Sequence, residues 1–387
     1  MVIYPTDWKT DKINNVAELF DNLRIPVTKN QRTPGSTPYY GANGIQDFVS
    51  GYTHDGEFVL IAEDGANDLL NYPVAYVNRR VWVNNHAHVL AGIKSVANTK
   101  FLSYLLKKVD YTAFLVGGTR AKLNGKTLKN IEITLPESLP EQQAIASVLS
   151  DFDEHIYNLT ELINKKKAIR EGALEDLISG RTRLDGFKGE WKESIIESVT
   201  KDIITGGTPS TSINNYWGGN IPWLASTEIH QKIITKATKY ITDIGLSNSS
   251  AKIAPKGSVL IALAGQGKTR GTAGFLSTPM ALNQSLAALV ASEETSSKFL
   301  FYLIENMYLY LRELSSGDGG RGGLNKTLLK NINILIPRDT REQEAIAQVL
   351  TAMDEEIECL EKEKEKMIQI SEGAMDDLLT GRVRLKV

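Results

Sequence analysis

Residues 172–184 read GALEDLISGRTRL, and residues 373–385 read GAMDDLLTGRVRL. The two stretches align at an offset of 201 residues, and at this offset the alignment continues without a gap back to Leu123 and Leu324. About half of the aligned positions are identical, which indicates an internal repeat.

The similarity continues upstream at a slightly different offset. Asn98–Leu106 (NTKFLSYLL) resembles Ser296–Ile304 (SSKFLFYLI) at an offset of 198, and at this offset Asn85 falls opposite Asn283. Further upstream the two halves diverge. The chain is therefore predicted to be a tandem duplication, in which the first part of each half varies and the last part is kept.

The kept parts have the pattern of long helices. Pro140 suits a first helical turn, and Gly180 and Gly381 suit the residue that ends a helix. Between them apolar residues recur in steps of four and three, which is the spacing of a coiled-coil seam. The seam residues are Ile145, Leu149, Phe152, Ile156, Leu159 and Ile163 in the first copy and Ile346, Leu350, Met353, Ile357 and Leu360 in the second.

Each of these helices is expected to span about 40 residues, or ~60 Å. Because a seam needs a partner, we expect the two helices to pack antiparallel and to keep the two globular parts apart. The alternative is a helical hairpin that only stabilises the protein and has no spacing role.

The variable parts have the pattern of mixed α/β domains. Strands are predicted at 57–63, 75–84, 258–264 and 285–291, and helices at 101–109 and 299–314. The expected fold class is α/β (α+β), a pseudo-two-fold tandem repeat of two globular domains joined by two antiparallel coiled-coil helices. Its expected segments are a first domain (1–137), a first long helix (138–182), a second domain (183–338) and a second long helix (339–387).

Charge is divided unevenly along the 387 residues, although the net charge is only −2. Residues 1–135 carry 15 Lys+Arg and 12 Asp+Glu, and residues 187–337 carry 15 and 11. The helical segments carry 6 against 10 (137–185) and 8 against 13 (338–387). Mildly basic globular parts permit phosphate contact, whereas acidic helices are typical of solvated faces or of protein contacts.

The composition predicts a cytoplasmic protein. No apolar run reaches the ~18 residues that a membrane span needs, and the first residues, MVIYPTDWKTDK, lack the apolar core of a secretory signal. The single cysteine, Cys359, fits a reducing compartment and is interpreted as a packing residue of its helix.

Motifs that suggest enzymatic chemistry are incomplete. The stretch GQGKT (265–269) resembles the end of a phosphate-binding P-loop, but Ala262 stands where that pattern requires glycine. His86 and His88 alternate on one predicted strand, and a metal site needs more ligands than this pair. The chain is therefore expected to be non-catalytic and to hold no metal.

The loop GGTPSTSINNYWGGNIPW (206–223), the loop KTRGTAG (268–274) and the two copies of the pattern LPxxxxEQxAIAxVL, of which the second begins with Ile336 in place of Leu, together resemble the specificity (S) subunit of type I restriction-modification systems. The resemblance covers nearly the whole chain. It implies two target recognition domains, each of which recognises one half of a bipartite DNA sequence, and a coiled coil that sets the gap between the half-sites.

The resemblance also implies partners and cofactors. Two methyltransferase (M) subunits would use S-adenosylmethionine to methylate adenine, and restriction (R) subunits, which use ATP and Mg²⁺, would translocate and cut DNA. The chain itself would bind double-stranded DNA without a cofactor and without a membrane. Half-sites about one DNA turn apart, near 34 Å, would suit helices of this length.

Arg and Lys can contact guanine or phosphate, and Asn and Gln can contact adenine, so residues of these types in the variable parts are candidates for DNA binding. The aromatic candidates are expected mainly to pack, with base stacking as the alternative. The candidates are Arg32, Tyr39, Tyr40, Asn43, Arg79, Arg80 and Arg120 in the first domain and Thr208, Ser210, Tyr216, Gln266, Lys268, Arg270 and Arg321 in the second.

Arg120 and Arg321 coincide at the offset of 201, and equivalent residues in domains that recognise different sequences should contact phosphate. Two other classes of protein remain open at this point. One is a sequence-specific DNA-binding regulator without methyltransferase partners, and the other is a protein-interaction scaffold. A co-purifying adenine methyltransferase would distinguish a type I specificity subunit from both alternatives.

Overall fold

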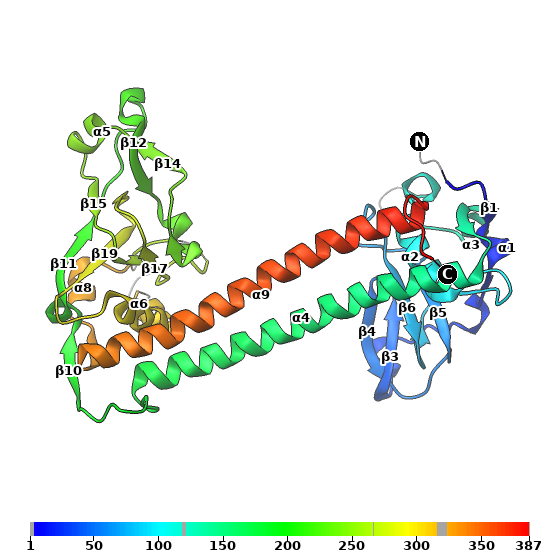
Figure 1. Cartoon of the computed structure of the whole chain (residues 1–387), viewed down its shortest axis with the longest axis horizontal. Helices are drawn as coiled ribbons and strands as arrows, with labels where there is room; N and C mark the ends of the chain where they lie inside the picture. Colours follow the sequence, from blue (N-terminus) through cyan, green and yellow to red (C-terminus); the bar gives the residue numbers. More distant parts are fainter. Residues whose placement is uncertain (1–3, 118–120, 266, 316–322, 387) are drawn as a thin grey trace. The chain divides into compact units, whose positions relative to one another are not determined.

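A computed structural model describes residues 4–117, 121–265, 267–315 and 323–386 (Figure 1). The chain forms two compact units, of which unit 1 contains residues 1–161 and 362–387 and unit 2 contains residues 162–361. The two predicted long helices are present as α4 (Leu139–Ser179) and α9 (Thr340–Thr380), and each contributes one part to each unit. No helix in the described ranges is long and apolar enough to cross a membrane.

The domain in unit 1 is built around two sheets. The central sheet is antiparallel with the order β2-β8-β5-β6, and the outer sheet has the order β4-β3-β7, in which β3 and β7 are parallel. The strands are β1 (Trp8–Lys12), β2 (Ala17–Leu19), β3 (Pro34–Gly41), β4 (Gly44–Val49), β5 (Glu57–Ala62), β6 (Val74–Asn78), β7 (Trp82–Val83), β8 (Ala87–Gly92) and β9 (Glu132–Pro136). The helices are α1 (Ile13–Val16), α2 (Thr99–Lys107), α3 (Gly125–Asn130) and the short η1 (Asp21–Leu23), η2 (Lys29–Gln31) and η3 (Thr112–Phe114).

The domain in unit 2 repeats this plan. Its central sheet has the order β11-β19-β16-β17-β13 and its outer sheet the order β14-β12-β18-β15. The strands are β10 (Trp191–Ile195), β11 (Thr200–Thr205), β12 (Trp217–Leu224), β13 (Ile233–Ile234), β14 (Lys239–Ile241), β15 (Lys252–Ala254), β16 (Val259–Ala262), β17 (Ala273–Leu276), β18 (Met280–Leu282), β19 (Leu286–Ala291) and β20 (Asn333–Pro337). The helices are α5 (Asp243–Ser247), α6 (Ser297–Asn306), α7 (Tyr308–Leu314), α8 (Lys326–Lys330), η4 (Ile196–Val199), η5 (Asn214–Tyr216) and η6 (Ser226–Gln231).

Two predicted elements are each divided in the structure. The strand predicted at 75–84 is two strands, β6 and β7, which belong to different sheets because the chain turns at Arg79 and Arg80. The helix predicted at 299–314 is α6 followed by α7, and it breaks at Met307, whose N–H is shared between the carbonyls of Leu303 and Ile304. Apolar periodicity continues across both interruptions, which is why the pattern alone did not show them.

The long helices pack along the predicted seam within each unit. In unit 1, Ile145 and Leu149 of α4 share a hydrophobic core with Leu378 and Leu379 of α9. In unit 2, Ile346 and Leu350 of α9 share a core with Leu174 and Leu177 of α4. Each contact joins the beginning of one helix to the end of the other, so the helices are antiparallel within each unit, as predicted.

A buried glutamine joins each domain to its long helix. Gln142 donates from Nε2 to the carbonyls of Pro136 at 2.8 Å and Val96 at 3.0 Å, and its Oε1 accepts from the backbone N–H of Asn98 at 2.8 Å. Gln343 repeats this arrangement in unit 2 with Pro337 at 2.9 Å and Ser296 at 2.9 Å. The repeated EQ motif therefore fixes the first turn of each long helix to the strand that precedes it and to the start of α2 or α6.

The repeated end of each long helix has a matching structural role. Gly180 and Gly381 take φ values of 72° and 70°, which suit glycine, and end the two helices as predicted. Arg183, after the first of them, pairs with Glu342 at 2.6 Å in unit 2, and Arg384 pairs with Glu141 at 2.5 Å in unit 1. In each unit, the second arginine of the shared GR-x-RL sequence thus joins the end of one long helix to the first turn of the other.

Candidate nucleic-acid interface

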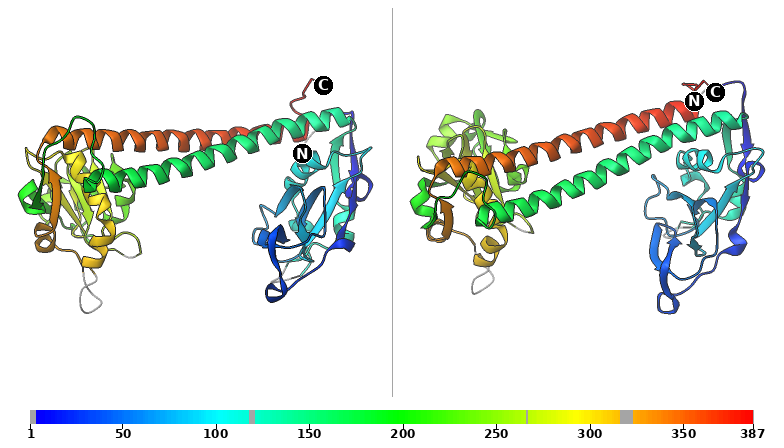
Figure 2. Two further views of the ribbon diagram at one scale, coloured as in Figure 1. Left: turned by 90° about the horizontal axis from the view of Figure 1, so that it is seen from below. Right: turned by 60° about the horizontal axis from the view of Figure 1, so that its bottom comes forward.

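Each domain has one sheet end that is joined to the long helices and an opposite end that carries loops (Figure 2). Strand β8 leads towards Asn98 and the Gln142 joint, and strand β19 leads towards Ser296 and the Gln343 joint. We call the opposite end of each sheet the distal edge of that domain. It consists of residues 41–44, 63–67, 84–86 and 121–123 in unit 1 and of residues 206–210, 263–265, 267–272 and 283–285 in unit 2.

The distal loop of unit 2, described at residues 263–265 and 267–272, is fixed by helix α7. Arg312 donates to the carbonyl of Gly267 at 2.7 Å, and the Tyr308 hydroxyl donates to the carbonyl of Lys268 at 3.0 Å. Gly271, at φ 82°, lies so close to α7 that a Cβ would meet Arg312 and Leu311 at 3.3 Å. Gly271 thus allows a close approach to α7. The element that follows the loop is strand β17 and not the helix that follows a P-loop.

The two described basic candidates of this loop differ in exposure. Lys268 is exposed, whereas Arg270 is half-buried, and its Nε is buried without a hydrogen-bond partner in the described part of the chain. The candidates Gln266 and Arg321 lie outside the described residues. The Lys268 side chain is therefore accessible to a ligand, whereas the Arg270 side chain is only partly accessible.

The glycine-rich loop after β11 brings Thr208 to the same distal edge. The Thr208 hydroxyl donates to Oε1 of Gln284 at 2.7 Å, which ties the loop to the turn before β19. Ser210 is exposed and bonds Ser212 at 2.8 Å. Tyr216 is half-buried and packs against Gly245 of α5. The structure therefore shows Tyr216 as a packing residue.

Two indole N–H groups hold this loop against the outer sheet. Trp223 donates to the carbonyl of Gly207 at 3.0 Å, and Trp217 donates to the carbonyl of Ser210 at 3.1 Å. Gly206 lies against the backbone of Leu282, whose carbonyl oxygen would be 1.8 Å from an added Cβ. The loop can take this path only with glycine at position 206.

We expect Gly206→Ala to destabilise unit 2 by about 2 kcal/mol, because the added methyl group overlaps backbone that cannot move aside as a side chain could. Denaturant unfolding monitored by tryptophan fluorescence measures the change. Gly189→Ala is the matched control, because a Cβ at that position meets nothing within 4 Å. Equal unfolding midpoints for the two variants would contradict the close approach.

In unit 1 the candidates Arg32 and Tyr39 are engaged within the domain. Tyr39 is 1% exposed, and its hydroxyl bonds the backbone of Val27. The Arg32 guanidinium lies 3.9 Å from the Tyr39 ring centroid and pairs with Asp47 at 3.2 Å. Tyr40 is also buried. These aromatic residues pack, and Arg32 would have to leave its partners to contact a base.

The remaining candidates of unit 1 lie at two different ends of the sheet. Asn43 is on the distal edge, where its side chain bonds Gly65 and Asn67 at 2.9 Å each. Arg79 and Arg80 lie in the turn at the opposite end of β6, where Arg80 pairs with Asp55 at 2.9 Å. Arg120 lies outside the described residues. The structure therefore does not gather the first-domain candidates into one surface.

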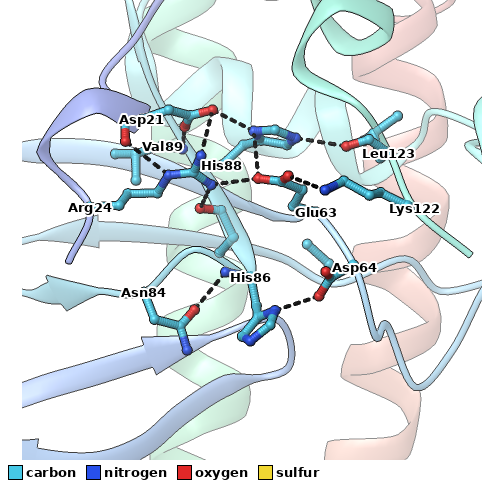
Figure 3. A network of polar contacts seen from close by, with 12 residues as sticks. Asp21, Arg24, Glu63, Asp64, Asn84, His86, His88, Val89, Lys122 and Leu123 are labelled. Carbon is cyan, nitrogen blue, oxygen red and sulfur yellow. Dashed lines mark hydrogen bonds and ion pairs between the residues drawn. The ribbon is translucent and has the colours of Figure 1, made fainter. Parts of the chain in front are cut away.

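A network of charged side chains lies behind the distal edge of unit 1 (Figure 3). His88 contacts Asp21 at 2.6 Å through Nδ1 and the carbonyl of Leu123 at 2.8 Å through Nε2, so both ring nitrogens face acceptors. Glu63 pairs with Arg24 at 2.7 Å and with Lys122 at 2.9 Å. The network ties η1 and residues 122–123 to the central sheet.

The same cluster contains a group of possible metal ligands. Among the described residues, the ligand atoms of Asp21, Glu63 and His88 lie within 4.8 Å of one another. Arg24 and Lys122 already pair with these carboxylates, so cations of the chain itself neutralise the site. We interpret the cluster as a structural ion network, with His88 buried inside it.

We expect unit 1 to lose stability as the pH falls from about 5 to about 3. Burial opposes the ionisation of Asp21 and Glu63, but hydrogen bonds from His88 to Asp21, and from Lys122 and Arg24 to Glu63, outweigh it, so both carboxyl pKa values lie below their usual range. A carboxylate with a lowered pKa stabilises the fold above its ordinary pKa, and this contribution is lost on protonation.

Hydrogen exchange of residues 4–117 across this pH range is the appropriate measurement. The double variant Asp21→Asn, Glu63→Gln should already be less protected at pH 7 and should show a shallower pH dependence. An unchanged pH dependence would show that other carboxylates are responsible.

The repeat alignment was wrong by one residue at the turn before β8 and β19. The side chain of Asn84 accepts from the backbone N–H of His86 at 2.8 Å, and the side chain of Asn283 accepts from that of Ser285 at 3.1 Å. Asn283 is therefore equivalent to Asn84 and not to Asn85, because the connection from β8 to the Asn98 cap of α2 is one residue longer than the connection from β19 to the Ser296 cap of α6. Sequence reasoning also missed Gln284, whose pairing with Thr208 becomes visible only in the structure.

Both repeats of this chain are similar to one known protein family. The family described as the type I restriction modification DNA specificity domain matches residues 5–169 and again residues 188–369. The chain therefore belongs to this family and carries two copies of its domain, which confirms the predicted repeat and the predicted family.

Individual relatives agree with this assignment. The MjaVIII specificity subunit of Methanocaldococcus jannaschii is 25% identical over a 423-residue alignment that covers 99% of this chain and 94% of that protein. The Haemophilus influenzae protein S.HindORF215P, whose name places it among type I specificity subunits, is 45% identical over 143 residues, which are 37% of this chain and 36% of that protein. The crystal structure of the S subunit from M. genitalium has a TM-score of 0.70 at 17% identity over 96% of both chains, which shows a shared fold.

Proposed function

We propose that this chain is the non-catalytic specificity subunit of a type I restriction-modification complex and that each of its two domains recognises one half of a bipartite DNA site. The observation that carries the proposal is the repeated domain, whose distal edge in unit 2 carries the bonded pair Thr208 and Gln284 and the exposed Lys268. Two domains of one fold with different loops are suited to recognise two different short sequences.

The long helices support a role in spacing and assembly. The antiparallel packing within each unit, closed by the Arg183–Glu342 and Arg384–Glu141 pairs, makes each domain continuous with a helix pair. In this proposal the coiled coil sets the gap between half-sites. The complex also contains two methyltransferase subunits, which use S-adenosylmethionine, and restriction subunits, which use ATP and Mg²⁺, while this chain holds no cofactor.

A map of N6-methyladenine in the host genome, with and without this gene, tests the proposal. We expect a bipartite motif that disappears on deletion and returns on complementation. An unchanged map would contradict the proposal and would favour a scaffold. Specific duplex binding without any methylation change would favour a regulator.

Arg270→Ala should weaken binding to the cognate duplex by about 1–3 kcal/mol if the half-buried guanidinium contacts a base. Fluorescence anisotropy with the cognate duplex and with a scrambled duplex measures the two affinities. Equal losses on both duplexes would assign Arg270 to a phosphate instead. Arg181→Ala is the control, because Arg181 is exposed beside the helix end and pairs with Glu175 at 2.7 Å.

A further inference from the structure

The turn before the last central strand has the same backbone structure in both domains. Asn84 and Asn283 are buried, with exposures of 4% and 8%. The N–H of Asn84 donates to the carbonyl of Tyr40 at 3.1 Å, and the N–H of Asn283 donates to the carbonyl of Leu224 at 3.0 Å. In each domain the turn is thus fixed to the outer sheet, and the following residue takes an equivalent position on the distal edge.

The residue at that position carries an exposed side-chain amide in both domains. It is Asn85 in unit 1 and Gln284 in unit 2, and both side chains are exposed. The surrounding loops are otherwise different, with Asn43 near one turn and Thr208 near the other. The two distal edges differ elsewhere but share this amide at an equivalent position. The shared amide therefore points to a feature of the ligand that both domains contact.

The hydrogen bonds leave amide N–H donors available at both positions. Oε1 of Gln284 accepts from the Thr208 hydroxyl at 2.7 Å, so Nε2 remains to donate outward. No hydrogen bond ties the Asn85 side chain to the described part of the chain. The neighbouring carboxylate of Asp64 lies 2.5 Å from Nδ1 of His86, with which it pairs.

We propose that Asn85 and Gln284 are equivalent anchor residues whose side-chain amides donate to backbone phosphate oxygens of DNA and so set the register of each domain on its half-site. The inference rests on the proposed function. Phosphate is the feature that half-sites of different sequence share, and amide side chains are common donors to it. Thr208 acts as a positioning residue, because its hydroxyl orients the Gln284 amide.

The test uses the full chain in complex with its methyltransferase partner. The probes are a labelled duplex that carries the methylated motif and a duplex of the same composition with both half-sites scrambled. We expect Asn85→Ala and Gln284→Ala each to weaken binding about fivefold on both duplexes, as for one lost hydrogen bond. Because the amides are neutral, the slope of affinity against salt concentration should stay unchanged, in contrast to the loss of a lysine contact.

Matched variants separate this contact from a change in fold. Asn14→Ala removes an exposed asparagine from α1, which lies at the helix end of the same domain, and should bind as the wild type does. Asn85→Asp and Gln284→Glu keep the shape of the side chain and place a negative charge against phosphate, so they should weaken binding more than alanine does. Thr208→Val should reproduce part of the Gln284→Ala loss and add little to it in the double variant.

The outcomes distinguish this inference from the proposed function. A loss on the cognate duplex alone would make these residues base readers and overturn the phosphate assignment. If the wild-type complex discriminates between the two duplexes, and the alanine and acidic variants bind both duplexes as the wild type does, the inference is overturned. The proposed function would then remain intact. A wild-type complex that binds both duplexes equally would contradict the proposed function itself.

Discussion

Arg170→Ala is expected to destabilise unit 2 by about 3 kcal/mol, because it leaves two partly buried carboxylates without their main cation. Arg170 lies on α4 with its side chain 10% exposed, and it pairs with Asp354 of α9 at 2.9 Å and with Glu305 of α6 at 2.5 Å. One side chain therefore joins both long helices to the domain. Lys232, which lies 2.8 Å from Glu305, should recover part of the loss.

Hydrogen exchange that reports separately on residues 162–265 and 4–117 measures this effect in unit 2 against unit 1. Lys167→Ala is the matched control on the same helix. Its pair with Glu361 is exposed, with side-chain exposures of 54% and 48%, and such pairs contribute about 0.5 kcal/mol. If both variants lose the same amount of stability, the burial of Arg170 does not increase its contribution to the stability of unit 2.

Gln142→Leu is expected to destabilise unit 1 by about 3 kcal/mol. Gln142 is fully buried, and leucine would leave the carbonyls of Pro136 and Val96 and the N–H of Asn98 without partners. A buried backbone group without a partner costs about 1–3 kcal/mol, and three such groups are affected here. Gln343→Leu should have a similar effect in unit 2.

The neighbouring glutamine provides the control. Gln143 is exposed and contacts only the Asn98 side chain among the described residues, so Gln143→Leu should leave stability nearly unchanged. Chemical denaturation of the three variants provides the comparison. If Gln142→Leu were as stable as Gln143→Leu, the joint between the domain and α4 would not depend on this amide.

The long helices were predictable because their determinants are local. Periodic apolar residues, a terminal glycine and a repeat at constant offset are all visible in one dimension. The role of the repeated motif residues was not visible, because Glu141 meets Arg384 and Glu342 meets Arg183 only after the helices pack. The common plan of the two domains was hidden for a related reason: buried strands accept many apolar residues, so similar sheets keep little sequence similarity.

The candidate site was predictable in its loops but not in its individual residues. The described parts of the glycine-rich stretch, 263–265 and 267–272, do lie on the distal edge of unit 2, and Lys268 is exposed there. Arg32 carried the right chemistry, yet Asp47 and the Tyr39 ring engage it. Gln284 carried no distinguishing signal because its partner Thr208 is remote in sequence, and distant pairings of this kind are set by tertiary structure.

The division of the chain into units has a consequence for its synthesis. Unit 2 is contiguous in sequence, so all of residues 162–361 can emerge and close together, whereas unit 1 also needs residues 362–387. Leu378 and Leu379 complete the core that contains Ile145 and Leu149, and at about 5–20 residues per second they leave the ribosome many seconds after those residues. The domain that is translated first is therefore completed last, and its apolar helix face is a ready target for a chaperone during that interval.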